Sequence, residues 1–283
     1  MFWQTTRFTI ALTQPQVMGI VNVTPDSFSD GGALATPSAA LAHCEKLLGE
    51  GADILDIGGE SSRPGALPVG ADEEWRRVRP VLAGALTLGC PVSLDTAHAE
   101  VMRAGLDLGV DIVNDINALR SPGALDEVAA HPSCGVCLMH MRGEPRLMQV
   151  DPTYDDVVTE VGQFLAERAQ RLRDRNVMAQ RIVLDPGIGF GKTVQHNFEL
   201  LKRQPELLRL GYPLLVGWSR KSSLGVVTGR PAGDRLVASV AAALAAVQAG
   251  ASVLRVHDVA ATIDALKVWR AAGLPARSGT IEG

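Results

Sequence analysis

The chain has 283 residues and a formal net charge of −4, and 46% of its residues are hydrophobic. This composition can fill one large core, so we expect a single domain over 1–283, with its core over about 17–275. The chain has no basic tract and only 4% aromatic residues, which argues against a nucleic-acid-binding protein. Its longest apolar stretch is too short to cross a membrane, and residues 1–14 lack the pattern of a secretory signal. We therefore expect a cytoplasmic protein without membrane contact.

Eight short apolar runs recur along the chain, and each is typical of a strand buried on both faces. The longer segments between them have apolar residues three and four positions apart, which predicts amphipathic helices, for example over 40–48, 157–168 and 237–247. Eight alternating strand and helix units in a chain of this length predict an α/β fold, the (β/α)8 TIM barrel. Residues 7–13 alternate weakly and suggest a small N-terminal β-hairpin that closes the bottom of the barrel. The eight runs are 17–24, 52–59, 91–97, 111–116, 135–141, 182–187, 213–219 and 252–257.

Nearly every run ends in polar or charged residues, which an ordinary buried strand has no reason to contain. In a TIM barrel the chemistry lies at the C-terminal ends of the strands, so these residues predict an active site there. They are Asn22, Asp56, Asp95, Asn114, Asp115, His140, Asp185, Ser219, Arg255 and His257.

Two motifs resemble known binding loops but have the wrong geometry or spacing. Cys134 and Cys137 have redox-motif spacing, but residues three apart on a strand point to opposite faces, so we expect buried reduced thiols. The segment 187–193 (GIGFGKT) resembles a phosphate-binding loop, but Pro186 stands where the first glycine would be required. Its interest lies in Asp185, which comes just before it at a strand end.

The loops after the first two runs also have the character of a catalytic rim. Segment 18–32 exposes an isolated Phe28, and segment 59–65 (GESSRPG) presents hydroxyls and Arg63. A polar loop rich in turn formers is the ordinary interpretation, but Phe28 has no periodic apolar partner. Two such loops could close over a substrate.

Eight blocks of the sequence, in order, closely resemble the bacterial dihydropteroate synthases, from about Val17 to Val259. They are MGIVNVTPDSFSDGG, GGESSRPGA, SLDT, VNDI, CLMHM, LDPGIGFGK, GWSRKS and LRVHDV. The resemblance implies a TIM-barrel transferase of folate biosynthesis, usually a homodimer. Such enzymes join 6-hydroxymethyl-7,8-dihydropterin diphosphate to 4-aminobenzoate and release 7,8-dihydropteroate and diphosphate. Because sulfonamides mimic aminobenzoate, we expect them to compete for its pocket.

The resemblance implies a pterin site whose donors and acceptors match the two polar edges of the ring. Carboxylates accept paired N–H groups, an amide both donates and accepts, and a guanidinium can lie against the ring face. A lone aspartate at a strand end is often only a helix N-cap, but three such polar groups together favour binding. The implied pterin residues are Asp95, Asn114, Asp185, Lys221, Met139, Phe190, Gly217 and Arg255.

The leaving diphosphate needs positive charge and Mg2+. By resemblance Asn22 is the protein ligand of Mg2+, which keeps waters and takes further oxygens from the phosphates. His257 alone would more often be structural, but Arg255 and His257 alternate on one strand and so face the same side. The implied diphosphate residues are Asn22, Ser61, Ser62, Arg63, Arg255 and His257, and the implied catalytic residues are Lys221, Arg63, Arg255 and His257.

For 4-aminobenzoate the resemblance implies a pocket in which a hydroxyl and a cation meet the carboxylate. Its residues would be Phe28, Ser62, Pro64, Ser219, Arg220 and Lys221. Arg220 is equally plausible as a surface residue. The reaction is expected to proceed by ionisation, without a strong general base, and we expect no nucleophilic Ser–His or Cys–His arrangement.

Two alternatives remain open, a pterin-binding methyltransferase barrel and a paralogue that binds pterin without catalysis. Phe28, Arg63, Pro64 and His257 argue against the methyltransferase, which has no diphosphate to neutralise. His98 stands where the family commonly has lysine, and we expect that change to affect only the surface of an outer helix.

Overall fold

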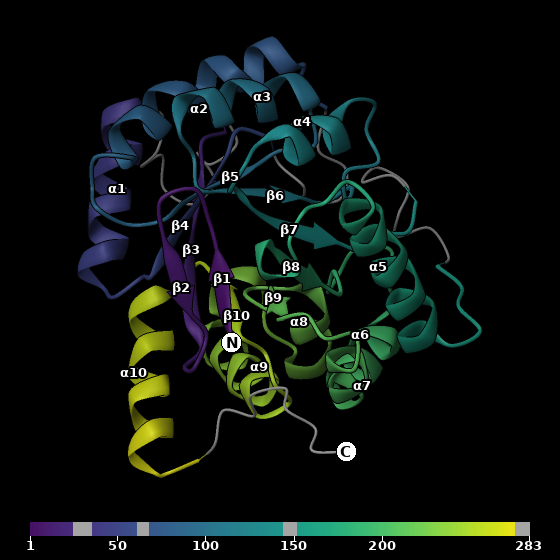
Figure 1. The fold of residues 1–283 in the computed structure, drawn as a ribbon. Coiled ribbons are helices and arrows are strands. Elements are labelled where there is room, and N and C mark those ends of the chain that lie inside the picture. Colours follow the sequence, from purple (N-terminus) through teal and green to yellow (C-terminus); the bar gives the residue numbers. More distant parts are fainter. Residues whose placement is uncertain (25–35, 61–67, 144–151, 275–283) are drawn as a thin grey trace.

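The computed structural model describes residues 1–24, 36–60, 68–143 and 152–274. Within them eight parallel strands form one sheet, with helices around the outside (Figure 1). The strands are β3 (Gln16–Asn22), β4 (Ile54–Gly58), β5 (Val92–Asp95), β6 (Ile112–Asp115), β7 (Gly135–Met139), β8 (Ile182–Asp185), β9 (Leu215–Val216) and β10 (Val253–Val256). Each coincides with one of the eight predicted apolar runs, so the predicted barrel is confirmed.

The sheet closes on itself through the pairing of β8 with the segment before β9. The strand order is β8-β7-β6-β5-β4-β3-β10-β9, and a parallel bridge joins Leu184 to Leu214. The register sets polar residues side by side at the C-terminal ends. Asp95 pairs with Asn114 across β5 and β6, and Met139 pairs with Asp185 across β7 and β8.

Three of the helices of the described residues begin at a side-chain N-cap, and the helices cover the outer face of the sheet with their apolar sides. The Thr36 side chain accepts the backbone N–H of Ala39, and Asp156 does the same for Thr159. The helices are α1 (Pro37–Gly49), α2 (Ala71–Ala85), α3 (Ala99–Leu108), α4 (Ala124–Ala130), α5 (Val157–Arg173), α6 (Val194–Lys202), α7 (Gln204–Leu208), α8 (Ser222–Thr228), α9 (Leu236–Gln248) and α10 (Val259–Ala271), with short 3-10 turns at Ala179–Arg181 and Ala232–Asp234. Among the helices of the described residues, none is long and apolar enough to cross a membrane.

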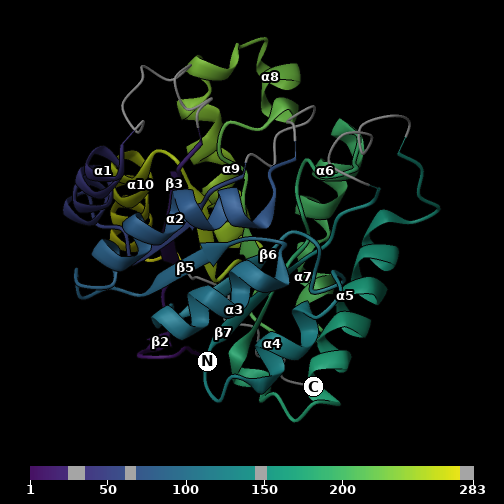
Figure 2. The same cartoon turned by 90° about the horizontal axis from the view of Figure 1, so that it is seen from above.

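An antiparallel hairpin precedes the barrel, as expected, but it starts earlier than the segment 7–13 predicts. Its strands are β1 (Phe2–Gln4) and β2 (Thr9–Ala11). Trp3 is fully buried, and its indole N–H donates to the Arg181 carbonyl oxygen at 2.9 Å. Figure 2 shows the hairpin at one end of the barrel and α8 at the other. Since Arg181 immediately precedes β8, the hairpin closes the N-terminal end of the barrel.

The core has an inner and an outer layer, and the two cysteines near β7 lie in different ones. Cys137 packs inside the barrel with Trp3, whereas Cys134 lies in the layer between strands and helices. All four cysteines are buried free thiols. This confirms that the spacing of Cys134 and Cys137 places them on opposite faces.

Candidate active site

Arg255 lies at the centre of the polar cluster at the strand ends. Its Nε donates to Asp56 Oδ2 at 2.6 Å, and its Nη2 donates to Asp95 Oδ2 at 2.6 Å. Asn114 Nδ2 donates to the same Asp56 oxygen at 3.2 Å. Four strands, β4, β5, β6 and β10, are thus joined through four side chains, three of which the sequence analysis assigned to the pterin.

A second group lies at the ends of β7 and β8 and combines apolar and charged side chains. Met139 and Phe190 are buried in one small apolar cluster. The Lys221 ammonium lies 4.1 Å from the centre of the Phe190 ring, within cation–π range. Asp185 Oδ1 accepts the backbone N–H of Gly187 at 2.7 Å. The structure therefore brings the predicted Asp185, Met139 and Phe190 to neighbouring positions, with Lys221 over the Phe190 ring.

Burial shifts the pKa values of Asp95 and Lys221 toward neutral pH. Burial raises the pKa of Asp95 to about 7, against the opposing charge of Arg255, and Asp56 and Glu74 raise it further. Burial lowers the pKa of Lys221 to about 8, against the attraction of Asp185. Burial likewise raises the pKa of Asp185. Such shifts are common where charged groups await a polar ligand.

Gly217 leaves room beside Arg255 that none of the described residues fills. A Cβ at this position would have Arg255 Cβ and the Arg255 carbonyl oxygen as its nearest neighbours, both at 3.9 Å. That is ordinary van der Waals contact, and Gly217 is not among the residues with positive φ. The fold does not require a glycine here, which supports the prediction that Gly217 shapes a ligand slot.

Ser219 and His257 form a hydrogen-bonded pair that the sequence analysis did not anticipate. His257 Nδ1 lies 3.0 Å from Ser219 Oγ, and the His257 backbone N–H donates to the same oxygen at 3.1 Å. The contact brings a hydroxyl and an imidazole together, and the expectation that no nucleophilic Ser–His arrangement exists stays a prediction. The two residues are 38 positions apart, so only the adjacency of β9 and β10 brings them together. Because Ser219 Oγ also accepts a backbone N–H, the pair fixes the hydroxyl in one orientation.

Arg220 is engaged with a neighbouring carboxylate. Its Nη2 donates to Asp258 Oδ1 at 2.8 Å, and its Nε donates to Asp258 Oδ2 at 3.2 Å. The guanidinium plane is thus held by an acid at the start of α10, which favours Lys221 over Arg220 as the cation for a substrate carboxylate.

The remaining predicted residues fall into two groups. Asn22 ends β3, is half-buried and pairs in register with Gly58. The predictions for Phe28, Ser61, Ser62, Arg63 and Pro64 lie outside the described residues.

Two of the polar strand ends serve the fold. Asp115 accepts the backbone N–H groups of Asn117 and Leu119 and so shapes the turn after β6. His140 Nδ1 lies 2.9 Å from Lys192 Nζ, and burial, followed by the Lys192 charge, lowers the pKa of His140 to about 2. His140 is therefore a neutral imidazole, and burial likewise lowers the pKa of its partner Lys192 to about 7.

Lys192 explains why the glycine-rich segment after β8 is not a phosphate loop. Its ammonium is buried and donates to the carbonyl oxygens of Gly187 and Phe190, each at 3.0 Å. Gly187 has φ of +68°, and a Cβ there would lie 1.9 Å from the His140 carbonyl oxygen. The glycines thus serve a tight turn that Lys192 holds from within.

The sequence analysis placed Asp56 among the strand-end residues of the site but assigned it no ligand. It is fully buried and binds both Arg255 and Asn114. An aspartate inside the apolar run ILDIG is a signal that a buried partner exists, because an unpaired buried charge is costly. The sequence does not identify that partner, which lies 199 positions away.

Comparison with known proteins places this site in a family. The model of the family described as "Pterin binding enzyme" matches residues 18–257. A dihydropteroate synthase of Neisseria meningitidis serogroup C is 54% identical over 276 residues, covering 96% of this chain and 98% of the relative.

Two solved structures match nearly the whole chain. The Burkholderia cenocepacia dihydropteroate synthase complexed with 7,8-dihydropteroate is 50% identical, with a TM-score of 0.88 and coverage of 96% of each chain. The Yersinia pestis enzyme with a sulfonamide drug complex is 43% identical, with a TM-score of 0.92 and coverage of 96% of this chain and 99% of that one. The chain therefore belongs to the pterin-binding enzyme family and, within it, to the dihydropteroate synthases.

Proposed function

We propose that this chain joins 6-hydroxymethyl-7,8-dihydropterin diphosphate to 4-aminobenzoate at the C-terminal ends of its barrel strands. The bond between the pterin methylene carbon and the diphosphate oxygen breaks, the amine nitrogen bonds to that carbon, and one amine proton is released. The products are 7,8-dihydropteroate and diphosphate. The observation that carries the proposal is the strand-end cluster of Asp95, Asn114 and Arg255. Asp185 and Lys221 complete it and influence each other's pKa.

The pterin would lie between these polar groups and the apolar cluster of Met139 and Phe190. Asp95 and Asp185 can accept N–H groups of the ring, and Asn114 can serve its amide edge. Burial makes such contacts selective, because a ligand without matching groups would leave charged side chains unpaired. Gly217 supplies the space beside Arg255 that a flat ring requires.

The diphosphate would be bound by the cationic groups nearest its leaving oxygen. Arg255 and His257 alternate at the end of β10, and Arg63 with Ser61 and Ser62 would join them. Arg255 is shared with two carboxylates, so its charge also holds the site together. Concentrated positive charge stabilises the diphosphate as the C–O bond breaks.

Mg2+ would be held by Asn22 together with oxygens of the diphosphate. The Asn22 side chain contains an amide oxygen, a hard donor of the type that Mg2+ accepts. A single neutral protein ligand would be sufficient only with waters and phosphate oxygens beside it, so the ion would arrive with substrate. When bound, Mg2+ supplies charge neutralisation of the leaving group.

The 4-aminobenzoate carboxylate would meet Lys221 and the oriented hydroxyl of Ser219. Phe28, Ser62 and Pro64 would complete this pocket, and Arg220 would contribute through its charge while bound to Asp258. We expect sulfonamides to compete here, since the related Yersinia pestis enzyme is known with a sulfonamide drug.

A homodimer is also part of the proposal and is supported by exposed apolar side chains on α8 and α9. Val226 and Val227 on α8 and Val237 on α9 are 68%, 64% and 80% exposed. Ala241 and Ala245 continue the exposed face of α9 at four-residue spacing, whereas Ala242, Ala243 and Ala246 pack inward. Small residues on an outer helix face allow a second helix to approach closely.

Purified protein incubated with Mg2+, the dihydropterin diphosphate and radiolabelled 4-aminobenzoate tests the reaction. We expect labelled dihydropteroate, and a loss of about 100-fold or more in rate for Asp185→Asn and Lys221→Ala. The control Lys267→Ala changes an exposed residue of α10 and should keep full activity.

Two further measurements, a pterin-binding titration and an assay with a methylated pterin and a corrinoid, separate the alternatives. Tight pterin binding without product would indicate an inactive paralogue. Methyl transfer from a methylated pterin to a corrinoid would indicate a methyltransferase barrel. Either result would overturn the proposal.

A further inference from the structure

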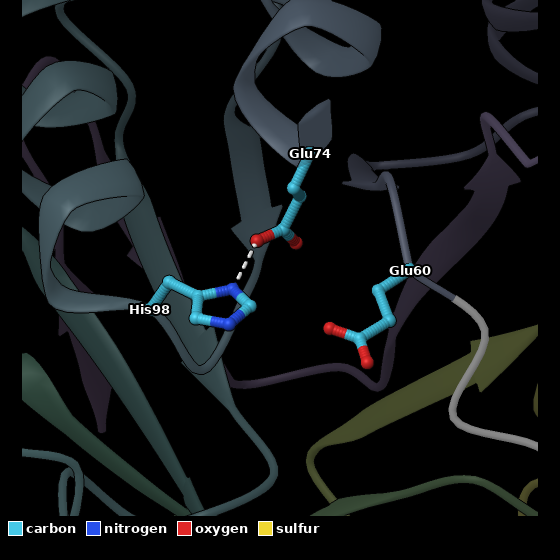
Figure 3. A group of neighbouring side chains, drawn as sticks. All are labelled: Glu60, Glu74 and His98. Carbon is cyan, nitrogen blue, oxygen red and sulfur yellow. Dashed lines mark hydrogen bonds and ion pairs between the residues drawn. The ribbon is translucent and has the colours of Figure 1, made fainter. Parts of the chain in front are cut away.

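Three side chains converge next to the pterin cluster without belonging to it. Glu60 follows β4, Glu74 lies on α2, and His98 is the N-cap residue of α3. One ligand atom from each lies within 4.8 Å of the others. Figure 3 shows the three side chains pointing toward a common space. His98 thus contacts a buried acid, and the expectation that it affects only the surface was wrong.

Glu74 is an unusual residue for an amphipathic helix, because it is fully buried. Its Oε2 accepts the Thr96 hydroxyl at 2.8 Å and lies 2.8 Å from His98 Nδ1. Its Oε1 is buried and has no hydrogen-bond partner among the described residues. In Figure 3 this second oxygen lies on the side of Glu60. A buried carboxylate oxygen without a partner costs free energy, so it marks a place where a further group is missing.

Among the residues that the structure describes, the charges around the cluster leave an excess of negative charge. Burial raises the pKa of Glu60, and repulsion from Glu74 raises it further. Arg77 opposes this repulsion, but its guanidinium binds Glu73 and the Gly59 carbonyl oxygen. The hydrogen bond to Glu74 raises the pKa of His98. One imidazolium charge still cannot offset the charges of two carboxylates.

We propose that Glu60, Glu74 and His98 bind a divalent transition-metal ion of the zinc class. Two carboxylate oxygens and one imidazole nitrogen form a mixed set, which suits Zn2+ or Co2+ better than the all-oxygen preference of Mg2+ and Ca2+. Three protein ligands leave a position for water. The site is separate from Asn22 and does not depend on the diphosphate.

Metal titrations of the metal-free full-length protein test the site without substrates. Visible absorption follows the binding of Co2+, and calorimetry follows the binding of Zn2+. We expect one equivalent of each ion to bind, with an absorption band typical of a protein-ligated cobalt ion. His98→Lys and Glu60→Gln should weaken this binding by about 100-fold or more, since each removes a direct ligand. His98→Lys retains positive charge beside Glu74, so the protein should remain folded.

The matched control is His43→Lys, which removes a half-buried histidine of α1 outside the cluster. It should leave the binding of both ions unchanged. The proposal would be overturned if His98→Lys bound the ions as tightly as the wild type. It would also be overturned if His98→Lys and His43→Lys lost metal affinity equally. Circular dichroism and urea midpoints of the variants exclude unfolding as the cause of a loss.

Discussion

At the scale of single residues, Arg255 binds two carboxylates of the site and would also bind the diphosphate, and these two roles oppose each other. Its guanidinium binds Asp56 and Asp95, which fixes its plane, but the same contacts neutralise charge that a diphosphate would need. Breaking one partner of a buried ion pair costs more than the pair contributes, because a charge is left without compensation. Asp56 is therefore a positioning residue. The orientation of Arg255 depends on it although we assign it no contact with substrate.

A substitution of Gly217 can test the effect on pterin binding separately from the effect on the stability of the fold. In Gly217→Ala the new methyl group has space in the free protein, so the free energy of unfolding should change by less than about 1 kcal/mol. In the complex the methyl group would occupy the pterin slot. We expect pterin affinity to fall by about 10-fold or more, since overpacking costs about 1–3 kcal/mol. Calorimetric titration with a pterin measures the affinity, and thermal unfolding measures the stability. An unchanged affinity would exclude Gly217 from the slot.

The lowered pKa of Lys221 predicts that kcat/KM depends on pH. Burial lowers its pKa to about 8, so the ammonium is present below that pH and is lost as the pH rises through it. If the ammonium donates to the pterin or the aminobenzoate carboxylate, kcat/KM should decline above about pH 8. The pH dependence of kcat/KM reports the pKa values of groups in the free enzyme. Lys221→Arg keeps its charge over this range, so whatever activity it retains should not show the decline. The same decline in both proteins would assign the titration to another group.

At the scale of elements, the hairpin closes the barrel at the end opposite the site. Trp3→Ala removes a fully buried indole and its bond to Arg181, so we expect a loss of about 3–5 kcal/mol in unfolding free energy. Phe2→Ala, in the same strand, is the control, because Phe2 is 44% exposed. Urea denaturation compares the two, and the dissociation constant for pterin should remain unchanged in both. A stability loss of equal size in the control would show that Trp3 has no special role.

The elements also show what local sequence can and cannot determine. The eight barrel strands follow from apolar runs that end in polar residues, because those runs differ from the amphipathic segments between them. β1 is three residues long, too short for a periodic pattern, so the hairpin was expected too late in the chain. The partners of Asp56 and Ser219 lie 199 and 38 positions away. Neither pairing has a local signal, and both require the closed barrel.

At the scale of the whole molecule, the outer surface of α8 and α9 bears on the proposed homodimer. Val237 is 80% exposed beside Ala241 and Ala245, and a contiguous apolar patch on a soluble protein usually marks an interface. Symmetric dimers bury such a patch against its own copy, so each substitution acts twice in the assembly.

Val237→Glu should therefore shift the protein from dimer to monomer. A charge placed at the centre of a self-complementary apolar contact meets its own copy, and both desolvation and repulsion oppose association. Light scattering coupled to size-exclusion chromatography measures the mass of each species over a range of concentrations. The control is Met178→Glu, which alters a 50% exposed residue just before the turn Ala179–Arg181 and should leave the mass unchanged. If Val237→Glu and wild type have the same mass at every concentration, this patch is not the interface. Because Val237 is outside the strand-end cluster, the monomer should still bind pterin, so loss of the dimer and loss of the site remain distinguishable.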